Sequence, residues 1–140
     1  SLLKTAQFGS EKAGEENKNI NTCILIWKEL NLQKADRKSL LINLGGGVIG
    51  DMGGFCAATF KRGIDFINIP TTLLSQVDAS VGGKLGIDFQ GFKNHIGVFK
   101  DPELVIIDPV FLKSLPNRVL YFIMCRYQVD FSGTSPRRST

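Results

Sequence analysis

The chain has 140 residues and a mass of 15.4 kDa; 43% of its residues are hydrophobic and 21% are charged. These values are typical of one globular domain, and they exclude a collagen-like chain, a coiled coil and a charged disordered tail. A domain of this size can bury roughly 68–70% of the surface that its unfolded chain exposes, so it can form a core without disulfides or a metal.

The net charge is +4, from 17 basic and 13 acidic residues, and most of the excess lies near the C-terminus. Residues 117–140 contain four arginines and one aspartate, so residues 1–116 carry a net charge of only +1. A nucleic-acid-binding surface needs clustered lysine and arginine with aromatic residues between them, and the body of the chain has no such stretch. We therefore expect no nucleic-acid partner.

The three cysteines, Cys23, Cys56 and Cys125, are distant in sequence and form no C-x-x-C motif. This spacing supports neither a disulfide framework nor a zinc ribbon, and it favours a reducing, cytoplasmic location. No apolar run reaches the ~18–20 residues that span a bilayer, and the first residues lack the pattern of a signal peptide. We expect neither membrane insertion nor export.

Helical and extended patterns alternate along the chain after a polar segment at residues 1–18. Apolar residues at helical spacing predict an amphipathic helix from Ile20 to about Asn31. The apolar run at residues 40–44, stopped by three glycines, predicts a strand buried on both faces. Residues 48–60 are rich in small side chains, and they predict a helix that follows this strand and its glycine turn.

The alternation continues through the second half of the chain. Residues 64–69 predict a strand, and residues 71–77 predict a short helix that begins with hydroxyl caps. A third strand is expected at 104–107, followed by a helix at 110–115 with a proline in its first turn. This order indicates an α/β fold: a Rossmann-like parallel sheet flanked by helices that cover both of its faces.

Two segments lack a regular pattern. Residues 80–99 contain glycines at five positions, and we expect a long loop of the kind that is usually functional or disordered. Residues 119–140 begin with an apolar run and end in a Ser-, Gly- and Arg-containing stretch that is typical of a disordered tail.

The glycines after the first predicted strand match the dinucleotide-binding pattern Gly45-x-Gly47-x-x-Gly50. Glycine at these positions permits a tight turn and lets backbone N–H groups approach a pyrophosphate at the helix N-terminus. Asp51 falls near the helix start, where it can cap the helix or accept a hydrogen bond from a ribose hydroxyl. A glycine turn that merely permits tight packing remains an open alternative. Asp65 has about the spacing of a Rossmann ribose ligand but stands at the beginning of a strand.

Other catalytic motifs are excluded or weak. Gly83-Lys84 is followed by Leu85 instead of Ser or Thr, so this stretch is not a phosphate-binding P-loop. His95 is the only histidine, which excludes a metal site that needs two imidazoles. We interpret it as a solvent-facing or packing residue, with a lone catalytic base as the alternative.

A polar set in and beside the glycine-bearing segment suits an anionic, hydroxylated ligand. Its members are Asp78, Lys84, Lys93 and Asn94. Lysine ammonium groups neutralise carboxylate or phosphate, while the asparagine amide offers a donor and an acceptor to hydroxyls. Solvated surface lysines are the alternative interpretation.

Several sequence blocks follow one another in a distinctive order: GGGVIGDMGGF (45–55), FKRG (60–63), IPTTLL (69–74), VDASVGGK (77–84) and KNHIG (93–97). Together they closely resemble the 3-dehydroquinate synthase family, over about residues 14–118. The resemblance implies an incomplete domain of the dehydroquinate synthase-like fold. It also implies a carbon–oxygen lyase that uses NAD and a divalent metal, zinc or cobalt. That enzyme converts 3-deoxy-D-arabino-heptulosonate 7-phosphate to 3-dehydroquinate and phosphate in the shikimate pathway to chorismate and the aromatic amino acids.

The resemblance also implies roles for individual residues. The positions that match NAD-binding residues of the family are Glu15, Lys18, Gly46, Gly47, Asp51, Thr71, Thr72, Leu74, Asp78 and Ala79. Those that match catalytic and substrate-binding residues are Asp78, Lys84, Lys93 and Asn94, joined by Arg62 as a substrate-binding residue that reaches phosphate across a homodimer interface. The substrate is a small sugar-phosphate acid.

The resemblance stops at Arg118, which divides the chain into a partial NAD-binding domain at 1–118 and a divergent tail at 119–140. The family's metal ligands, one glutamate and two histidines, belong to a C-terminal helical domain that we expect to be absent here. Arg126 stands where the glutamate is expected and cannot ligate a cation. We therefore assign no metal ligand to this chain and expect no turnover from it alone.

Three alternatives stay open. The chain can be a non-catalytic, NAD-binding remnant, or it can derive from a related 2-deoxy-scyllo-inosose synthase or glycerol dehydrogenase-type enzyme. The lysine and asparagine set favours an acidic, polyhydroxylated substrate over glycerol. An incomplete domain exposes apolar faces, so we also expect low solubility or self-association.

Overall fold

The computed structural model describes residues 14–78 and 82–113. The predictions for Ala79, for the tail at 119–140 and for the end of the helix expected at 110–115 lie outside the described residues. Among the described residues, no helix has both the length and the apolar character needed to cross a bilayer.

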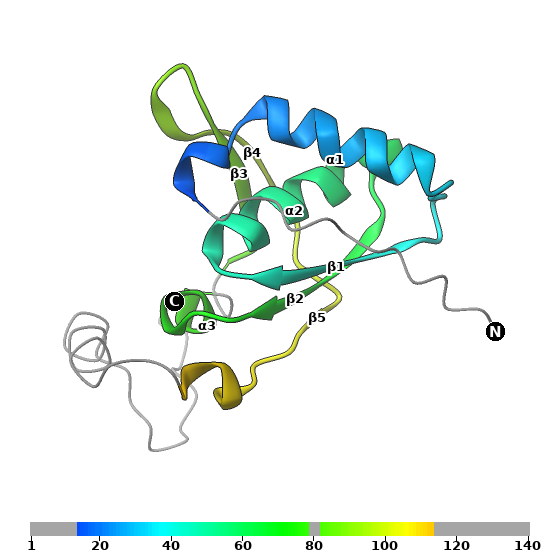
Figure 1. Ribbon diagram of the computed structural model, residues 1–140. Coiled ribbons are helices and arrows are strands. Elements are labelled where there is room, and N and C mark those ends of the chain that lie inside the picture. Colours follow the sequence, from blue (N-terminus) through cyan, green and yellow to red (C-terminus); the bar gives the residue numbers. More distant parts are fainter. Residues whose placement is uncertain (1–13, 79–81, 114–140) are drawn as a thin grey trace, which may run out of the picture.

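From α1 to α3, helices and strands alternate in the order that the sequence predicts (Figure 1). The elements are η1 (Glu15–Asn17), α1 (Ile20–Leu32), β1 (Leu40–Gly45), α2 (Gly47–Thr59), η2 (Phe60–Arg62), β2 (Asp65–Pro70), α3 (Leu73–Asp78), β3 (Lys84–Phe89), β4 (Phe92–Phe99), β5 (Leu104–Val105) and η3 (Pro109–Leu112). Strands β1, β2 and β5 form a parallel sheet in that order. The predicted α/β fold with a Rossmann-like parallel sheet is therefore confirmed.

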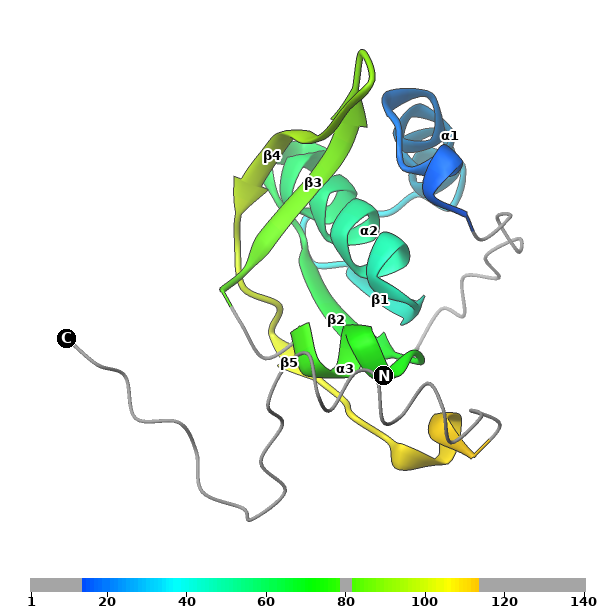
Figure 2. The ribbon, with the colours of Figure 1, turned by 90° about the vertical axis from the view of Figure 1, so that its left-hand side faces the viewer.

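Helix α2 lies at the centre of the molecule, between the sheet and a hairpin formed by β3 and β4 (Figure 2). Its small residues permit this close packing. A Cβ atom added to Gly53 would lie 2.1 Å from Asn43 Oδ1, and one added to Gly54 would lie 2.4 Å from Leu85 Cδ2. The fully buried side chains around it, including Phe66, form the core.

Helix α1 packs against α2 through Trp27 and a pair of cysteines. The indole Nε1 of Trp27 donates a hydrogen bond to the backbone oxygen of Cys56 at 3.2 Å, and its ring lies 6.4 Å from that of Phe55. Cys23 and Cys56 are both free thiols with no solvent exposure. A hydrogen bond between them lowers the pKa of Cys23, and the same bond together with burial raises the pKa of Cys56.

The expectation that helices cover both faces of the sheet is wrong for the described residues. Along β1, exposed and buried residues alternate, and Leu40, Ile42 and Leu44 are 48%, 49% and 58% exposed. Leu104 on β5 lies on the same face, because its register partner Ile67 pairs with Ile42. We call Leu40, Ile42, Leu44 and Leu104 the apolar face. The apolar run predicts strand β1 correctly, but it does not show whether a partner covers the second face.

The expectation of a long loop at 80–99 is also wrong, because most of this segment forms the antiparallel hairpin β3–β4. Its two-residue turn, Gln90-Gly91, has φ angles of 50° and 82°, as in a type I′ turn. Gly86 and Gly97 face each other across the hairpin, and a Cβ on Gly97 would lie 2.3 Å from the backbone oxygen of Leu85. Gly86 and Gly97, which indicate a loop in the sequence, instead allow the two strands of the hairpin to lie close together.

Smaller differences concern the element ends. Strand β5 is shorter than the predicted 104–107, and the residues after Asp108 form a 3-10 turn instead of an α-helix. Asp108 caps that turn by accepting a hydrogen bond from the backbone nitrogen of Val110 at 2.9 Å. The predicted hydroxyl cap of α3 is confirmed: the backbone nitrogen of Ser75 donates to Thr72 Oγ1 at 3.2 Å.

Candidate functional site

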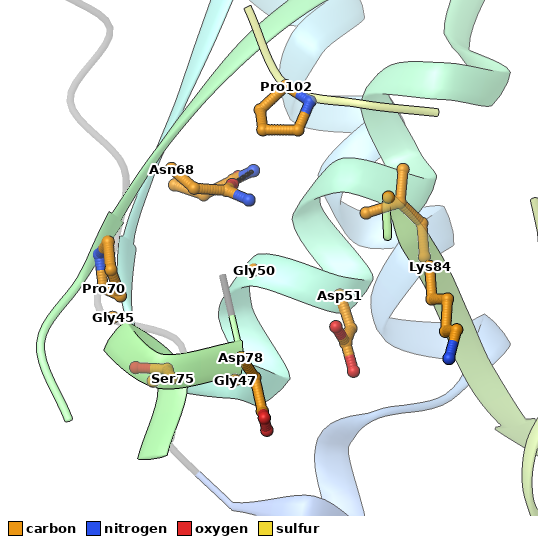
Figure 3. A pocket seen from close by; sticks show the side chains of 14 residues that line it. Gly45, Gly47, Gly50, Asp51, Asn68, Pro70, Ser75, Asp78, Lys84 and Pro102 are labelled. Carbon is orange, nitrogen blue, oxygen red and sulfur yellow. Dashed lines mark hydrogen bonds between the residues drawn. The ribbon is translucent and has the colours of Figure 1, made fainter. Parts of the chain in front are cut away.

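A cleft with two lobes opens at the carboxyl ends of β1 and β2, where parallel α/β sheets usually bind ligands. The smaller lobe, about 130 Å³, is lined by the glycine turn after β1 and by residues of α3 and β3 (Figure 3). The larger lobe, about 580 Å³, is lined mainly by the hairpin. Asp51, Asp78, Lys84 and Leu85 line both lobes, so the two are adjacent.

The glycine turn leaves the N-terminus of α2 open to the cleft. Gly46 is the N-cap residue, no side chain caps the helix, and its first turn contains no acidic residue. A Cβ atom on Gly47 would meet nothing within 4 Å, whereas one on Gly45 would lie 2.7 Å from Ile49 Cγ1. Packing thus explains the glycine at 45 but not the one at 47. An uncapped helix N-terminus in open space fits a bound anion such as a pyrophosphate.

Asp51 does not cap α2; it forms an ion pair. Its Oδ2 accepts a hydrogen bond from Lys18 Nζ at 2.6 Å, and the side chains of Lys18 and Asp51 are 5% and 39% exposed. Lys18 Nζ also donates to Asn94 Oδ1 at 2.6 Å. The fold thus brings together three residues of the predicted site from distant parts of the sequence.

The other predicted substrate residues lie in different places. Asp78 ends α3 and Lys84 begins β3, and Figure 3 shows their side chains extending in the same direction as that of Asp51. Lys93 does not line either lobe; its Nζ lies 3.2 Å from Glu15 Oε1 in an exposed ion pair. The geometry therefore groups Asp78, Lys84 and Asn94 at the cleft and leaves Lys93 beside it.

Thr71 and Thr72 lie in the β2–α3 connection next to the glycine turn, and Leu74 follows in α3. The backbone nitrogen of Thr71 donates to the backbone oxygen of Gly45 at 2.9 Å, and a Cβ on Gly46 would lie 3.2 Å from Thr72 Cγ2. Leu74 is 42% exposed. Thr71, Thr72 and Leu74 line neither lobe. Pro70 and Ser75, from the same stretch of chain, line the smaller lobe.

Three further residues lie away from the cleft. Arg62 is exposed, and it precedes β2 at the amino end of the strand, opposite the glycine turn. Asp65 is at that same end, so it is not placed to bind a ribose beside the turn. His95 is exposed and lies 5.2 Å from the ring of Phe92, which confirms the solvent-facing interpretation.

Sequence analysis missed an asparagine pair on the sheet side of the smaller lobe. Asn43 on β1 and Asn68 on β2 are register partners, and Asn43 Nδ2 donates to Asn68 Oδ1 at 2.9 Å. Both line the lobe, and Asn43 is only 6% exposed (Figure 3). The signal was available: each asparagine interrupts an otherwise apolar strand two residues before its end.

Within residues 14–78 and 82–113, no group of three or more His, Cys, Asp or Glu side chains could hold a metal ion. Besides apolar side chains such as Leu85 and Val98, the lobes are lined by carboxylate, ammonium, amide and backbone groups. Such an arrangement can bind an anionic cofactor and a hydroxylated acid, but it offers no cluster of donors for a divalent cation.

The parallel sheet, the glycine turn and the cleft at the strand ends define the chain as a Rossmann-like α/β domain. A family model described as 3-dehydroquinate synthase N-terminal matches residues 10–121, and the chain belongs to that family. A 3-dehydroquinate synthase of Sulfurovum sp. is 63% identical over 105 residues, which are 75% of this chain and 30% of the relative. The chain thus spans about 30% of the length of that relative.

Two solved structures are similar in both sequence and fold. The 2-epi-5-epi-valiolone synthase of Streptomyces hygroscopicus, with NAD+ and Zn2+ bound, is 32% identical with a TM-score of 0.73, and the match covers 77% of this chain and 30% of that one. A 2-deoxy-scyllo-inosose synthase complexed with carbaglucose-6-phosphate, NAD+ and Co2+ is 30% identical with a TM-score of 0.74, over 81% of this chain and 31% of that one.

Proposed function

We propose that this chain is the nucleotide-binding part of a cytoplasmic 3-dehydroquinate synthase. The enzyme would convert 3-deoxy-D-arabino-heptulosonate 7-phosphate to 3-dehydroquinate and phosphate. The observation that carries the proposal is the geometry of the cleft: an open α2 N-terminus leads to Asp78, Lys84 and Asn94. The 63% identity to the Sulfurovum enzyme supports the choice of reaction.

The cleft fits NAD. Backbone N–H groups at Gly46 and Gly47 would bind the pyrophosphate, and Asp51 at the rim would accept a hydrogen bond from a ribose hydroxyl. The remaining residues proposed to contact NAD are Glu15, Thr71, Thr72, Leu74, Asp78 and Ala79, whereas Lys18 pairs with Asp51 and does not line either lobe. When bound, NAD would supply a reversible hydride acceptor for oxidising a substrate alcohol to a ketone, and the ketone would acidify the C–H beside the leaving phosphate.

The larger lobe is the proposed substrate site. The Lys84 ammonium would neutralise the substrate carboxylate or phosphate, and Asn94 and Asp78 would orient its hydroxyls beside the nicotinamide. Lys93 would first have to leave its ion pair with Glu15. That step costs little, because exposed ion pairs contribute only about 0–1 kcal/mol.

The proposed enzyme also needs a divalent metal, whose ligands we place outside the described residues. The residues described here do not fit a zinc or cobalt site, so we derive no step through a metal and assign its ligands to a separate helical domain. We also propose a homodimer in which Arg62, exposed at the amino end of β2, reaches the substrate phosphate of a second copy. No nucleic-acid or membrane partner is proposed.

Isothermal titration of the chain with NAD+ tests the cofactor site. The wild-type chain should bind NAD+, and Gly47→Ala should weaken binding at least tenfold, because the added methyl projects into the space proposed for the pyrophosphate. Since that Cβ meets nothing within 4 Å, the variant should unfold at the same urea concentration as the wild type or slightly higher. Wild-type chain that does not bind NAD+ would contradict the proposal.

A phosphate-release assay tests the expectation that the chain alone is inactive. Purified chain with 3-deoxy-D-arabino-heptulosonate 7-phosphate, NAD+ and Zn2+ should release no phosphate above the background without protein, because the substrate would lack its metal. A complete 3-dehydroquinate synthase serves as the positive control. Turnover by the chain alone would overturn this expectation.

A further inference from the structure

Lys18 is the most deeply buried charged residue of the cleft region, with only 4% of its surface exposed. It lies between η1 and α1, and its Nζ contacts Asp51 on α2 and Asn94 on β4, each at 2.6 Å. The ammonium group therefore joins three elements. Asp51 neutralises the charge of this ammonium group. Without that partner, the buried cation would strongly destabilise the fold.

The contact with Lys18 determines which way the Asn94 amide faces. A lysine ammonium can only donate hydrogen bonds, so Asn94 must present its oxygen, not its nitrogen, to Nζ. The Nδ2 group, with its two N–H bonds, then faces away from Lys18. Asn94 lines the larger lobe, so its Nδ2 group can donate to a ligand there, whereas its Oδ1 already accepts a hydrogen bond from Lys18 Nζ.

The backbone of Asn94 is held by the same region. Asn94 has a φ of 50°, in the left-handed region that asparagine tolerates better than most residues. Its N–H donates to Asp88 Oδ1 at 2.8 Å, and the N–H of Asp88 donates to the backbone oxygen of Lys18 at 2.8 Å. Both the backbone and the side chain of Asn94 are thus tied to the Lys18 segment.

We propose that Lys18 is a positioning residue that turns the Asn94 amide so that its N–H groups donate to an oxygen of the ligand in the larger lobe. The inference rests on the proposed function for the identity of that ligand, a hydroxylated sugar acid. Lys18 acts through Asn94 and Asp51, because its ammonium is already bound by both and is not exposed to the cleft. This role differs from the direct NAD contact that the family resemblance implies.

A double-mutant cycle on stability tests the contact without any ligand. Urea unfolding is measured for the wild type, Lys18→Met, Asn94→Ala and the double variant. The two substitutions should be non-additive, with a coupling of at least fivefold in the unfolding equilibrium constant. Lys28→Met, at an exposed position of α1, is the matched control and should be additive with Asn94→Ala. Additive effects for Lys18 would overturn the proposal.

Asn94→Asp keeps the test decisive if Lys18→Met does not fold. Aspartate retains an oxygen for Lys18 but has no N–H to donate, and its added charge is attracted by Lys18 and repelled by Asp51. Affinity for 3-deoxy-D-arabino-heptulosonate 7-phosphate at saturating NAD+ should fall at least tenfold. Unchanged affinity would overturn the proposed direction of the amide.

The same titration separates positioning from a merely structural role. Lys18→Met should lower affinity for this sugar acid at least fivefold in the wild-type background and should cost nothing more in the Asn94→Ala background. A purely structural lysine would lower affinity by the same factor in both, which would overturn the proposal. If the wild-type chain binds no sugar acid, the proposed function fails, and the stability cycle alone decides whether Lys18 positions Asn94.

Discussion

Glycines that look alike in the sequence lack a side chain for different physical reasons in the structure. Gly53 admits the buried amide of Asn43, and Gly97 admits a neighbouring backbone carbonyl, whereas Gly47 faces open space in the cleft. A pattern match cannot separate these cases, because it records only that a side chain is absent. The asparagine pair, of which Asn43 lies beside Gly53, is marked in the sequence only as a polar interruption of each strand.

Gly97→Ala should destabilise the chain by about 1–3 kcal/mol, the usual cost of overpacking. The added Cβ would lie 2.3 Å from the backbone oxygen of Leu85, and backbone cannot move aside as a flexible side chain can. Urea unfolding measures the loss, and Gly47→Ala is the matched control that should show none. Equal stability of the two variants would mean that the hairpin strands are further apart than described.

At the scale of elements, sequence periodicity predicts α1, β1, α2 and β2 to within about two residues at each end. The hairpin was missed because its glycines carry the same signal as a loop, and its pairing depends on contacts between strands. Burial of β1 on both faces was also predicted wrongly. An apolar run indicates that a strand can be buried, but only tertiary packing determines which faces of its sheet are covered.

The hairpin turn offers a stabilising substitution. Gln90 has a φ of 50°, which is unfavourable for glutamine, while asparagine is the preferred residue before glycine in a type I′ turn. Gln90→Asn should therefore raise the free energy of unfolding by about 0.5–1 kcal/mol. Thermal melting provides the measurement. Gln90→Val, which is β-branched, should lower the midpoint, and the opposite order would contradict the assigned turn.

At the scale of the molecule, the apolar face groups exposed hydrophobic residues on one side of the sheet, because three large side chains of β1 lie about half exposed on the same face as Leu104. Contiguous apolar surface of this kind favours association in water. The chain spans about 30% of the length of the Sulfurovum relative, so this prediction of self-association applies to the 140-residue chain alone.

Ile42→Lys should reduce that self-association. Ile42 is 49% exposed on the face of β1 that points away from the core, so a charge there can remain solvated without disturbing the packing around α2. Sedimentation velocity should show the wild type growing in apparent mass with concentration, and the variant shifting toward monomer. Leu32→Lys, at a 75% exposed position of α1, adds the same charge elsewhere and should leave association unchanged. A wild-type chain that is monomeric at all concentrations contradicts the prediction.

The position of Trp27 gives the molecule an intrinsic optical reporter. It is the only tryptophan of the chain, and its indole is hydrogen-bonded to α2 from α1, the helix that begins two residues after Lys18. Detachment of α1 would move this ring from a largely apolar contact into water, which shifts tryptophan emission to longer wavelength. Fluorescence can thus follow the undocking of that helix separately from the loss of total helical signal in circular dichroism, with no label attached.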